Sequence, residues 1–530
     1  MNEFYEYFEK KFSKRRNLID IVVEDDESSD FPREAQNLID DGLLKFIVPI
    51  SQGGELKGID HLFTLGRCLA RRNVTSAIAV GQCFLGSLPI WIHGSDEQKK
   101  RLTEILFESG LNCLALTEKE HGSDLSACEV IVKDTNGKRL LNGQKWCINN
   151  ATKGKAMSVL AMGEVGPTLI FIDKEKLKEE QFSNIEKLRT HGIKGADISG
   201  IKFKDLELAD DSFIGREGRA LETIARTMQI SRTLCSAFSL GAADTTFRDA
   251  INFSGTRVLY GETLNKRGSV RSLTSKALAY ILASEATSIS VTRMATLAPK
   301  FMALYSAVVK SFVPYMIDKQ IDICKEILGA RYYLREDDYP MFQKMVRDHS
   351  VISLFDGSMG VNLSIIASKF NNIKKHLDAD EEYDFEEVYN VKYESIHFDG
   401  STLKLSSRSL DFVFSAFNTL MEEDTRGVVF QVKTEIETLR SYIENVNDYT
   451  TYMARETSLR YCRIVTAINY LLFVKFNQES ILPALSTDDS VQFVISTILE
   501  QSCDYQYDEE VFNHYRDNHL ISHFNIGVSE

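Results

Sequence analysis

The chain has 530 residues, of which 43% are hydrophobic and 26% are charged, a composition typical of a globular protein with several domains. No apolar run reaches the ~18 residues of a membrane-spanning helix. The formal net charge is −14, and residues 371–530 contain 13 Lys and Arg against 28 Asp and Glu, which disfavours nucleic acid or an anionic membrane as a partner.

The nine cysteines show neither a paired CxxC spacing nor a cluster with histidines. This pattern favours free, buried thiols in a reducing compartment and predicts no metal site. The acidic and aromatic start of the chain, from Met1 to Glu6, differs from a secretory or mitochondrial targeting signal. We therefore expect a cytoplasmic protein without a bound metal.

Residues 1–112 have apolar residues at helical spacing, interrupted by Gly53-Gly54. Ser95 is the expected N-cap of a helix whose first turn holds Asp96 and Glu97, where the helix dipole favours anions. The sequence thus predicts a helical N-terminal domain.

Residues 113–212 have a different period, because Cys128 to Lys133 alternates between polar and apolar residues and is rich in β-branched side chains. Asn136-Gly137 and Asn142-Gly143 each predict a tight hairpin turn. Further strands are expected at residues 158–161, 168–172 and 201–208. Together these segments predict a small antiparallel β-domain.

Helical patterns return in residues 213–370, where the run from Leu273 to Val309 is long and rich in alanine, as in a helical bundle. Residues 371–530 follow as an acidic extension that starts with a charged linker at 378–382. Within it, helices are expected at residues 412–420, 432–449 and 461–476. The predicted fold class is mainly α with a small β-domain, divided into residues 1–112, 113–212, 213–370 and 371–530.

Four short motifs could carry chemistry. They are Leu116-Thr117-Glu118, Gly122-Ser123-Asp124, Asn142-Gly143-Gln144-Lys145 and, after Arg347-Asp348, Phe355-Asp356-Gly357-Ser358. In kind and spacing they resemble the acyl-CoA dehydrogenase family over about residues 35–370. The order of a helical domain, a β-domain and a helical bundle is also the order of that family. Asp356 stands where the family has its catalytic glutamate.

The resemblance implies a flavoprotein that binds FAD. Leu116 and Thr117 would face the flavin ring, and Gly122 and Ser123 would reach the pyrophosphate or the substrate. Ile148 and Asn149 fall in the segment that lines the ring, with Asn149 in place of a threonine. Contacts to the rest of the dinucleotide would come from Arg257, Tyr260 and Ser358.

The sequence departs from the family pattern at several of these positions. Cys147 replaces an aromatic residue that shields the flavin, and the neighbouring Trp146 can serve instead as a core residue. Gly268 and Gly360 replace two glutamines on the adenine side, which would alter the mode or the affinity of FAD binding. Since the family's equivalent of Arg257 crosses to a neighbouring subunit, the resemblance also implies a homodimer or homotetramer.

By the same resemblance Asp356 would be the base that removes the α-proton of an acyl thioester, with Ser123, Arg232, Phe355 and Gly357 lining the substrate site. Aspartate is one methylene shorter than glutamate, which leaves three functions open. The first is FAD-dependent α,β-dehydrogenation of an acyl-CoA or an acyl carrier protein, with electron-transfer flavoprotein or oxygen as acceptor. The second is flavin-dependent oxidation of another carbon acid, such as a nitroalkane. The third is a catalytically degenerate binding or assembly subunit, in which the acidic extension makes the contact. Separately from these functions, Asp356 could merely cap a helix and Arg232 could be a surface residue in a helix.

Overall fold

The computed structural model describes most of the chain. The described residues are 18–27, 30–335, 338–377, 383–394, 398–405, 411–422 and 424–517. The expectations for residues 1–6 and for the linker at 378–382 fall outside these ranges.

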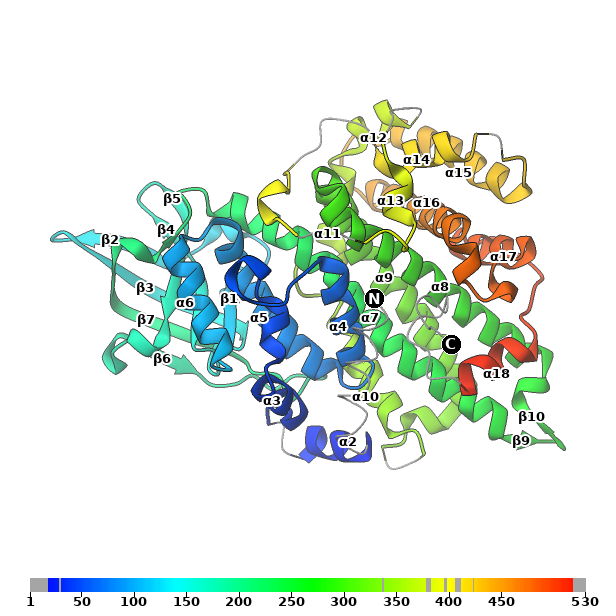
Figure 1. Ribbon diagram of the computed structural model, residues 1–530, viewed down its shortest axis with the longest axis horizontal. Coiled ribbons are helices and arrows are strands. Elements are labelled where there is room, and N and C mark those ends of the chain that lie inside the picture. The colour runs from blue at the N-terminus through cyan, green and yellow to red at the C-terminus, as the bar shows by residue number, and fades with distance from the viewer. Residues whose placement is uncertain are drawn as a thin grey trace.

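The N-terminal part is helical, as the sequence predicted. Its helices are α2 (Leu18–Glu27), α3 (Arg33–Asp40), α4 (Ile59–Ala70), α5 (Val74–His93) and α6 (Asp96–Phe107). Ser95 is confirmed as the N-cap of α6, since its side chain accepts from the backbone N–H of Gln98 and the Gln98 side chain bonds back in a capping box. Of these, α4, α5 and α6 stand between the sheet and the long helices of the bundle, and α2 and α3 lie below them in the view of Figure 1.

Helix α5 corrects the expectation about apolar runs. By length and composition alone, Val74–His93 could cross a membrane, but 83% of its most apolar window is buried inside the protein. That burial is what a core helix requires. Asn73 caps its start by accepting from the backbone N–H of Thr75, and its apolar faces contact both the sheet and α7.

The β-domain is one eight-stranded sheet, seen at the left of Figure 1. Its strands are β1 (Asn112–Ala115), β2 (Ile131–Thr135), β3 (Lys138–Asn149), β4 (Ala156–Gly163), β5 (Gly166–Asp173), β6 (Phe182–Ile185), β7 (Ile198–Leu208) and β8 (Phe213–Ile214). The sheet is mixed rather than wholly antiparallel, because β1 runs parallel to β4 and Ile131 of β2 pairs in parallel with Met162. The β2–β3 hairpin is part of the crossover connection that a parallel pair needs.

One of the two predicted hairpin turns is confirmed and the other is wrong. Asn136 and Gly137 join β2 to β3 with φ angles of 56° and 75°, as a tight primed turn requires. Asn142 and Gly143, in contrast, lie inside β3. Gly143 has a φ of 128° and lies beside a register shift at which β7 has one residue more than β3, so the bulge is in β7 and strand β3 continues through the glycine.

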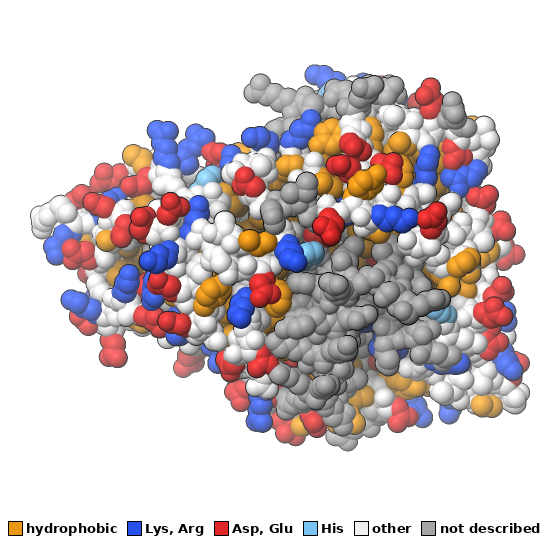
Figure 2. Space-filling model, in the orientation of Figure 1, with side chains coloured by type: hydrophobic (Ala, Val, Ile, Leu, Met, Phe, Trp, Pro, Cys, Tyr) orange, Lys and Arg blue, Asp and Glu red, His pale blue; other side chains and the backbone are white. Residues whose placement is uncertain are grey.

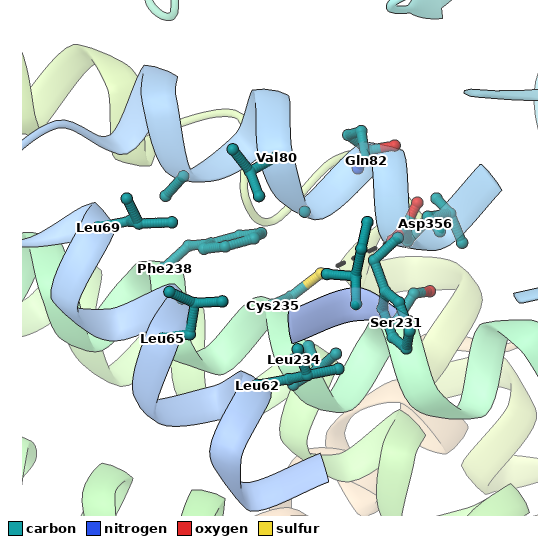
Figure 3. Close-up of a pocket in the computed structure, with 16 residues that line it drawn as sticks. Leu62, Leu65, Leu69, Val80, Gln82, Ser231, Leu234, Cys235, Phe238 and Asp356 are labelled. Atoms are coloured by element: carbon teal, nitrogen blue, oxygen red, sulfur yellow. Dashed lines mark hydrogen bonds between the residues drawn. The ribbon is translucent and has the colours of Figure 1, made fainter. Parts of the chain in front are cut away.

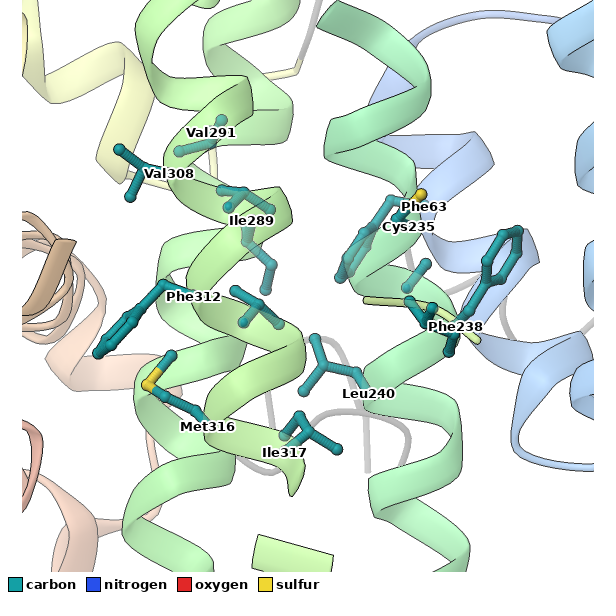
Figure 4. Packing of buried hydrophobic residues seen from close by; sticks show 14 of the residues in the cluster. Phe63, Cys235, Phe238, Leu240, Ile289, Val291, Val308, Phe312, Met316 and Ile317 are labelled. Atoms are coloured by element: carbon teal, nitrogen blue, oxygen red, sulfur yellow. The ribbon is translucent and has the colours of Figure 1, made fainter. Parts of the chain in front are cut away.

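The bundle consists of three long helices and shorter ones after them. They are α7 (Ala220–Thr256), α8 (Gly268–Leu297), α9 (Met302–Leu328), α10 (Pro340–His349), α11 (Met359–Ala367) and α12 (Phe370–His376). The alanine-rich run is divided between α8 and α9 because Pro299 follows the end of α8. Figure 4 shows Leu240 of α7 and Ile317 of α9 directed toward one another in the apolar core between these helices.

The extension packs on the outer side of the bundle. Its helices are α13 (Phe385–Tyr389), α14 (Phe412–Leu420), α15 (Gly427–Glu444), α16 (Tyr452–Asn477), α17 (Asp488–Ile498) and α18 (Glu509–Asp517). The bounds predicted for α14 are confirmed, whereas α16 begins well before residue 461 because Thr451 caps it by accepting from Ala454 N–H. The Asp411 carboxylate accepts from the hydroxyls of Tyr305 on α9 and Tyr461 on α16, so extension and bundle share one core.

On the face drawn in Figure 2, acidic and basic side chains are interspersed over the β-domain. At the other end of the molecule, β9 (Val258–Leu259) and β10 (Glu262–Thr263) form a short hairpin. Tyr260 at its tip is 92% exposed.

Candidate active site

An apolar cavity lies between α4, α5 and α7 and contains Asp356 at one end. Its cavity volume is about 40 Å³. Of its lining residues, Asp356 is the only one with a carboxylate, and most of the others are aliphatic or aromatic. Figure 3 shows Asp356 beside Ser231 and Cys235, with Phe238 and Leu69 at the far end.

The backbone around Asp356 is held in an unusual conformation. Asp356 and Gly357 have φ angles of 55° and 91°, and a left-handed residue other than glycine costs on the order of 1–3 kcal/mol. Arg232 Nε donates to the Asp356 carbonyl at 3.0 Å, and Asn362 Nδ2 donates to the Gly357 carbonyl at 2.8 Å. These bonds fix the turn between α10 and α11 so that the carboxylate points into the cavity.

Burial raises the pKa of Asp356, whereas the Lys310 ammonium, the Ser231 hydroxyl and the Arg232 guanidinium act in the opposite direction. Cys235 Sγ lies 3.8 Å from Asp356 Oδ2. A desolvated carboxylate with a raised pKa is what a general base working near neutral pH needs.

Lys310, on α9, is buried beneath this turn and is 1% exposed. Its Nζ donates to the Ile352 carbonyl and lies 4.9 Å from the centre of the Phe355 ring. Burial lowers the pKa of Lys310, opposed by the Cys235 thiol and the Asp356 carboxylate. The lysine thus supports the backbone before Asp356 and places a positive charge behind the carboxylate.

The two flavin-type motifs lie next to one another. The backbone N–H of Trp146 donates to the Thr117 carbonyl at 3.0 Å. Lys145 Nζ donates to the Leu116 carbonyl at 2.9 Å and to Glu118 Oε1 at 2.7 Å. Burial opposes the charge of Glu118, but Lys145 and two backbone N–H groups outweigh it and lower the pKa of Glu118 to about 2. The buried ion pair therefore fastens the 116–118 segment to β3.

The end of β3 lies behind one wall of the cavity. Cys147 is the inserted residue of a second bulge, with a φ of 59°, and its side chain is exposed. Ile148 is buried and Asn149 is half-buried. Asn150 Nδ2 donates to the Ala79 carbonyl at 2.9 Å, and Ala79 lies between Ala77 and Val80, two residues of α5 that line the cavity.

The remaining predicted site residues lie away from the cavity or have another role. Gly122 and Ser123 lie in an exposed loop after β1. Arg257 and Tyr260 are exposed on the β9–β10 hairpin, at the opposite end of the molecule from the β-domain, so one chain does not bring them to Thr117 (Figure 1). Ser358 caps α11 by accepting from Val361 N–H at 3.4 Å.

The interpretation of Asp356 as a helix cap is wrong, because Ser358 is the N-cap of α11. The interpretation of Arg232 as a mere surface residue is also wrong, because its Nε donates to the Asp356 carbonyl.

Several residues around Asp356 were not predicted from the sequence. Ser231 and Cys235 are one turn apart on α7 and flank Arg232, so helical spacing alone could have selected them. Phe238 continues the same face of that helix into the cavity. Lys310 carried a different signal, as a lone cation in the apolar run from Val308 to Phe312.

Two family models match the chain. Residues 113–206 match the middle domain of acyl-CoA dehydrogenases, and residues 218–370 match their C-terminal domain. The chain is 26% identical over 351 residues to cyclohex-1-ene-1-carbonyl-CoA dehydrogenase of Geobacter metallireducens, covering 65% of this chain and 91% of the relative. It is 24% identical to the acyl-CoA dehydrogenase of Bacillus subtilis, covering 62% of this chain and 86% of the relative.

Solved structures share the fold. Butyryl-CoA dehydrogenase from Megasphaera elsdenii superposes with a TM-score of 0.64 at 22% identity, over 70% of this chain and 97% of the other. The prolyl acyl carrier protein oxidase AnaB gives a TM-score of 0.63 at 19% identity, over 69% of this chain and 97% of the other. The matched motifs, the order of the domains and these relatives agree, and the chain, through residues 113–370, belongs to the acyl-CoA dehydrogenase family of oxidoreductases.

Proposed function

We propose that the protein is an FAD-dependent enzyme that removes hydrogen from the α and β carbons of an acyl thioester, with Asp356 as the base. The observation that carries this proposal is the desolvated carboxylate at one end of an otherwise apolar cavity. Walls of this kind suit an acyl chain, because apolar side chains bind alkyl groups and exclude water. At about 40 Å³ the cavity has to widen to take one. At the thioester end, Asp356 takes the proton from the α carbon.

The residues of the β-domain fit the flavin of FAD. Asn149 Oδ1 is buried and has no hydrogen-bond partner among the described residues, so it offers an acceptor to a ligand N–H. Leu116 and Thr117 lie on the neighbouring segment, where Lys145 and Trp146 hold their carbonyls in place. Bound FAD supplies the acceptor for the hydride that leaves the β carbon.

The other predicted residues would position Asp356 or bind FAD. Arg232 and Gly357 fix the turn that presents Asp356, and Phe355 packs against Lys310 behind it. Arg257 and Tyr260, exposed on their hairpin, are suited to reach the FAD of a second subunit in a homodimer or homotetramer. Acyl-CoA and acyl carrier protein are both proposed donors, in line with the relatives that act on each. An electron-transfer flavoprotein is proposed to accept the electrons from the reduced flavin.

The test is anaerobic bleaching of the bound flavin by a panel of acyl-CoA and acyl carrier protein thioesters. The wild type is expected to bleach with at least one of them. Asp356→Asn removes the base with little change in shape, so the variant should keep its flavin and lose bleaching by a factor of roughly 10² or more. Normal bleaching by this variant would show that Asp356 is not the base.

A second arm of the same experiment tests nitroalkanes, also without oxygen, because oxygen would reoxidise the reduced flavin and hide the bleaching. The shorter Asp356 in place of the family's glutamate is the specific observation that favours oxidation of another carbon acid. Bleaching by nitroalkanes alone would replace the dehydrogenase proposal with this one, and no bleaching by any substrate would favour a binding subunit.

A further inference from the structure

A short segment of the extension lies on the helices that enclose the cavity. It covers residues 398–405, and we call it the strap. It contains the short helical turn η10 (Gly400–Thr402), which Asp399 caps by accepting from the backbone N–H of Ser401. Figure 1 shows it in yellow, between the labelled helices of the extension and α5. The strap thus brings the extension to the N-terminal helices.

The strap contacts two of the cavity helices from the N-terminal part. The backbone N–H of Phe398 donates to the carbonyl of Lys57, just before α4, at 3.3 Å. Gly400 lies against Ile92 of α5, and a Cβ added to this glycine would be only 2.7 Å from Ile92 Cγ1. The strap can approach α5 this closely because Gly400 has no side chain.

The strap contacts the third cavity helix, α7, through Gln229. Gln229 Nε2 donates to the Lys404 carbonyl at 2.8 Å, and the glutamine is 3% exposed. This is the only hydrogen bond of the Gln229 side chain among the described residues, since its Oε1 has no partner there. Packing alone does not require an amide at this place, because an apolar side chain would fill it without leaving a polar atom unpaired. The amide therefore serves the contact with the strap.

The same stretch of α7 carries the contacts of Asp356. Arg232 lies one turn after Gln229 on the same face of the helix, and its Nε donates to the Asp356 carbonyl. The Ser231 hydroxyl and the Cys235 thiol lie against the Asp356 carboxylate. Because the strap holds this stretch against α4 and α5, it fixes the carboxylate relative to the cavity walls.

We propose that the strap positions Asp356 for the proposed reaction, with Gln229 as the positioning residue through which it acts. The inference rests on the proposed function, since the position of Asp356 affects a rate only if this carboxylate takes the proton. A displacement of ~1 Å between a base and its substrate can cost ~10²-fold in rate. The extension thereby has a role in the reaction, although none of the described residues that line the cavity belongs to it.

Two variants of the full chain loosen the strap from opposite sides. Gln229→Met keeps the length of the side chain and removes the donor. Gly400→Ala pushes the strap away from Ile92 and leaves the residues of α7 unchanged. The matched controls are Gln320→Met, which removes a fully buried amide between α9 and α7, and Gly427→Ala, at the start of α15, where a Cβ meets nothing within 4 Å.

The first readout is anaerobic bleaching of the flavin by an acyl thioester, measured across pH. Both strap variants should lower kcat by roughly 10- to 10²-fold and change KM little, because the side chains that line the cavity are kept. Burial raises the pKa of Asp356, and Ser231 and Arg232 oppose this rise. When these two are less well placed, the pKa should rise further and the acid limb should move to higher pH. A purely structural contact would lower the melting temperature and leave the limb in place, as expected for the controls.

The second readout is hydrogen exchange of backbone amides, which needs no reaction. Both strap variants should exchange faster than the wild type in peptides that contain residues 229–235 and 353–358, and the controls should not. Unchanged exchange in these peptides would overturn the inference, and so would faster exchange with a normal kcat and an unshifted acid limb. If no thioester bleaches the wild type, the proposed function fails, and the exchange result alone then decides for or against the strap.

Discussion

The ion pair between Glu118 and Lys145 gives the most direct test of how the flavin segment is built. Glu118 accepts from Lys145 Nζ at 2.7 Å and from the N–H groups of Glu129 and Val130 at 2.8 and 3.1 Å. The side chains of Lys145 and Glu118 are 0% and 6% exposed. Glu118→Gln keeps the shape of the side chain but leaves the buried ammonium without a carboxylate.

The expected loss of folding stability in Glu118→Gln follows from the pKa of Glu118. A carboxyl with an ordinary pKa of 4.5 that titrates at about 2 in the folded protein contributes roughly 3 kcal/mol of stability at neutral pH. Breaking a buried ion pair from one side costs ~3–5 kcal/mol in general, which agrees. Because the pKa is lowered, the contribution is complete above pH 4.5 and is lost as the pH falls toward 2.

The assay is urea unfolding followed by tryptophan fluorescence in a Trp91→Phe background. The chain has two tryptophans, and the remaining Trp146 adjoins Lys145 and bonds to Thr117. Glu118→Gln should lower the stability reported by Trp146 by about 3 kcal/mol at pH 7, and less at acid pH. Adding Lys145→Met should restore part of it, since no charge is then left buried.

Two results would refute this reasoning. One is a Glu118→Gln variant as stable as its parent at pH 7. The other is a double variant that loses the full sum of the two single losses, because independent residues are additive and a coupled pair is not. Flavin retention in the same samples shows whether the 116–118 segment must be fastened for binding.

Two further predictions concern the cavity. Phe238 closes the far end of the cavity, and a Cβ on Gly81 would lie only 2.5 Å from Phe238 Cζ. Phe238→Ala should therefore lengthen the cavity and shift kcat/KM toward longer acyl thioesters, at a cost of ~3–5 kcal/mol in stability. An unchanged chain-length profile would place the acyl group elsewhere. Lys310→Met removes the positive charge that lowers the pKa of Asp356 most, so this pKa should rise and the acid limb of the kcat/KM profile should move to higher pH, while Lys310→Arg should keep it in place. A pH profile that does not move in Lys310→Met would mean that Asp356 does not set that limb.

Local chemistry made some of the fold predictable. Ser95 with Gln98 three residues later, and Asn136-Gly137 between alternating strands, each specify one backbone geometry almost regardless of context. Asn142-Gly143 has the same composition as a turn, yet β7 pairs with β3 on both sides of it, so the strand continues through the glycine. Pairing between distant strands outweighs a local turn signal, and a single sequence does not show that pairing.

The candidate site divides in the same way. Asp356 and Arg232 were predicted from motif spacing, and the structure brings them together. Lys310 approaches from a helix more than forty residues away in sequence, so its contact with Ile352 depends on how α9 packs. The start of α16 was predicted too late because its first turns are polar. Apolar periodicity finds the buried middle of a helix, not its exposed beginning.

The carboxylate of Asp411 has a consequence for how the chain can be divided. It is buried, and it receives hydroxyls from two helices that are more than 150 residues apart in the chain. A fragment that stops at residue 370 would leave Tyr305 facing water and strip the cover from α8, against which α16 and α17 pack. Truncating the chain to the length of its shorter relatives would therefore expose an apolar surface and promote aggregation. The enzyme has to be studied as the full chain.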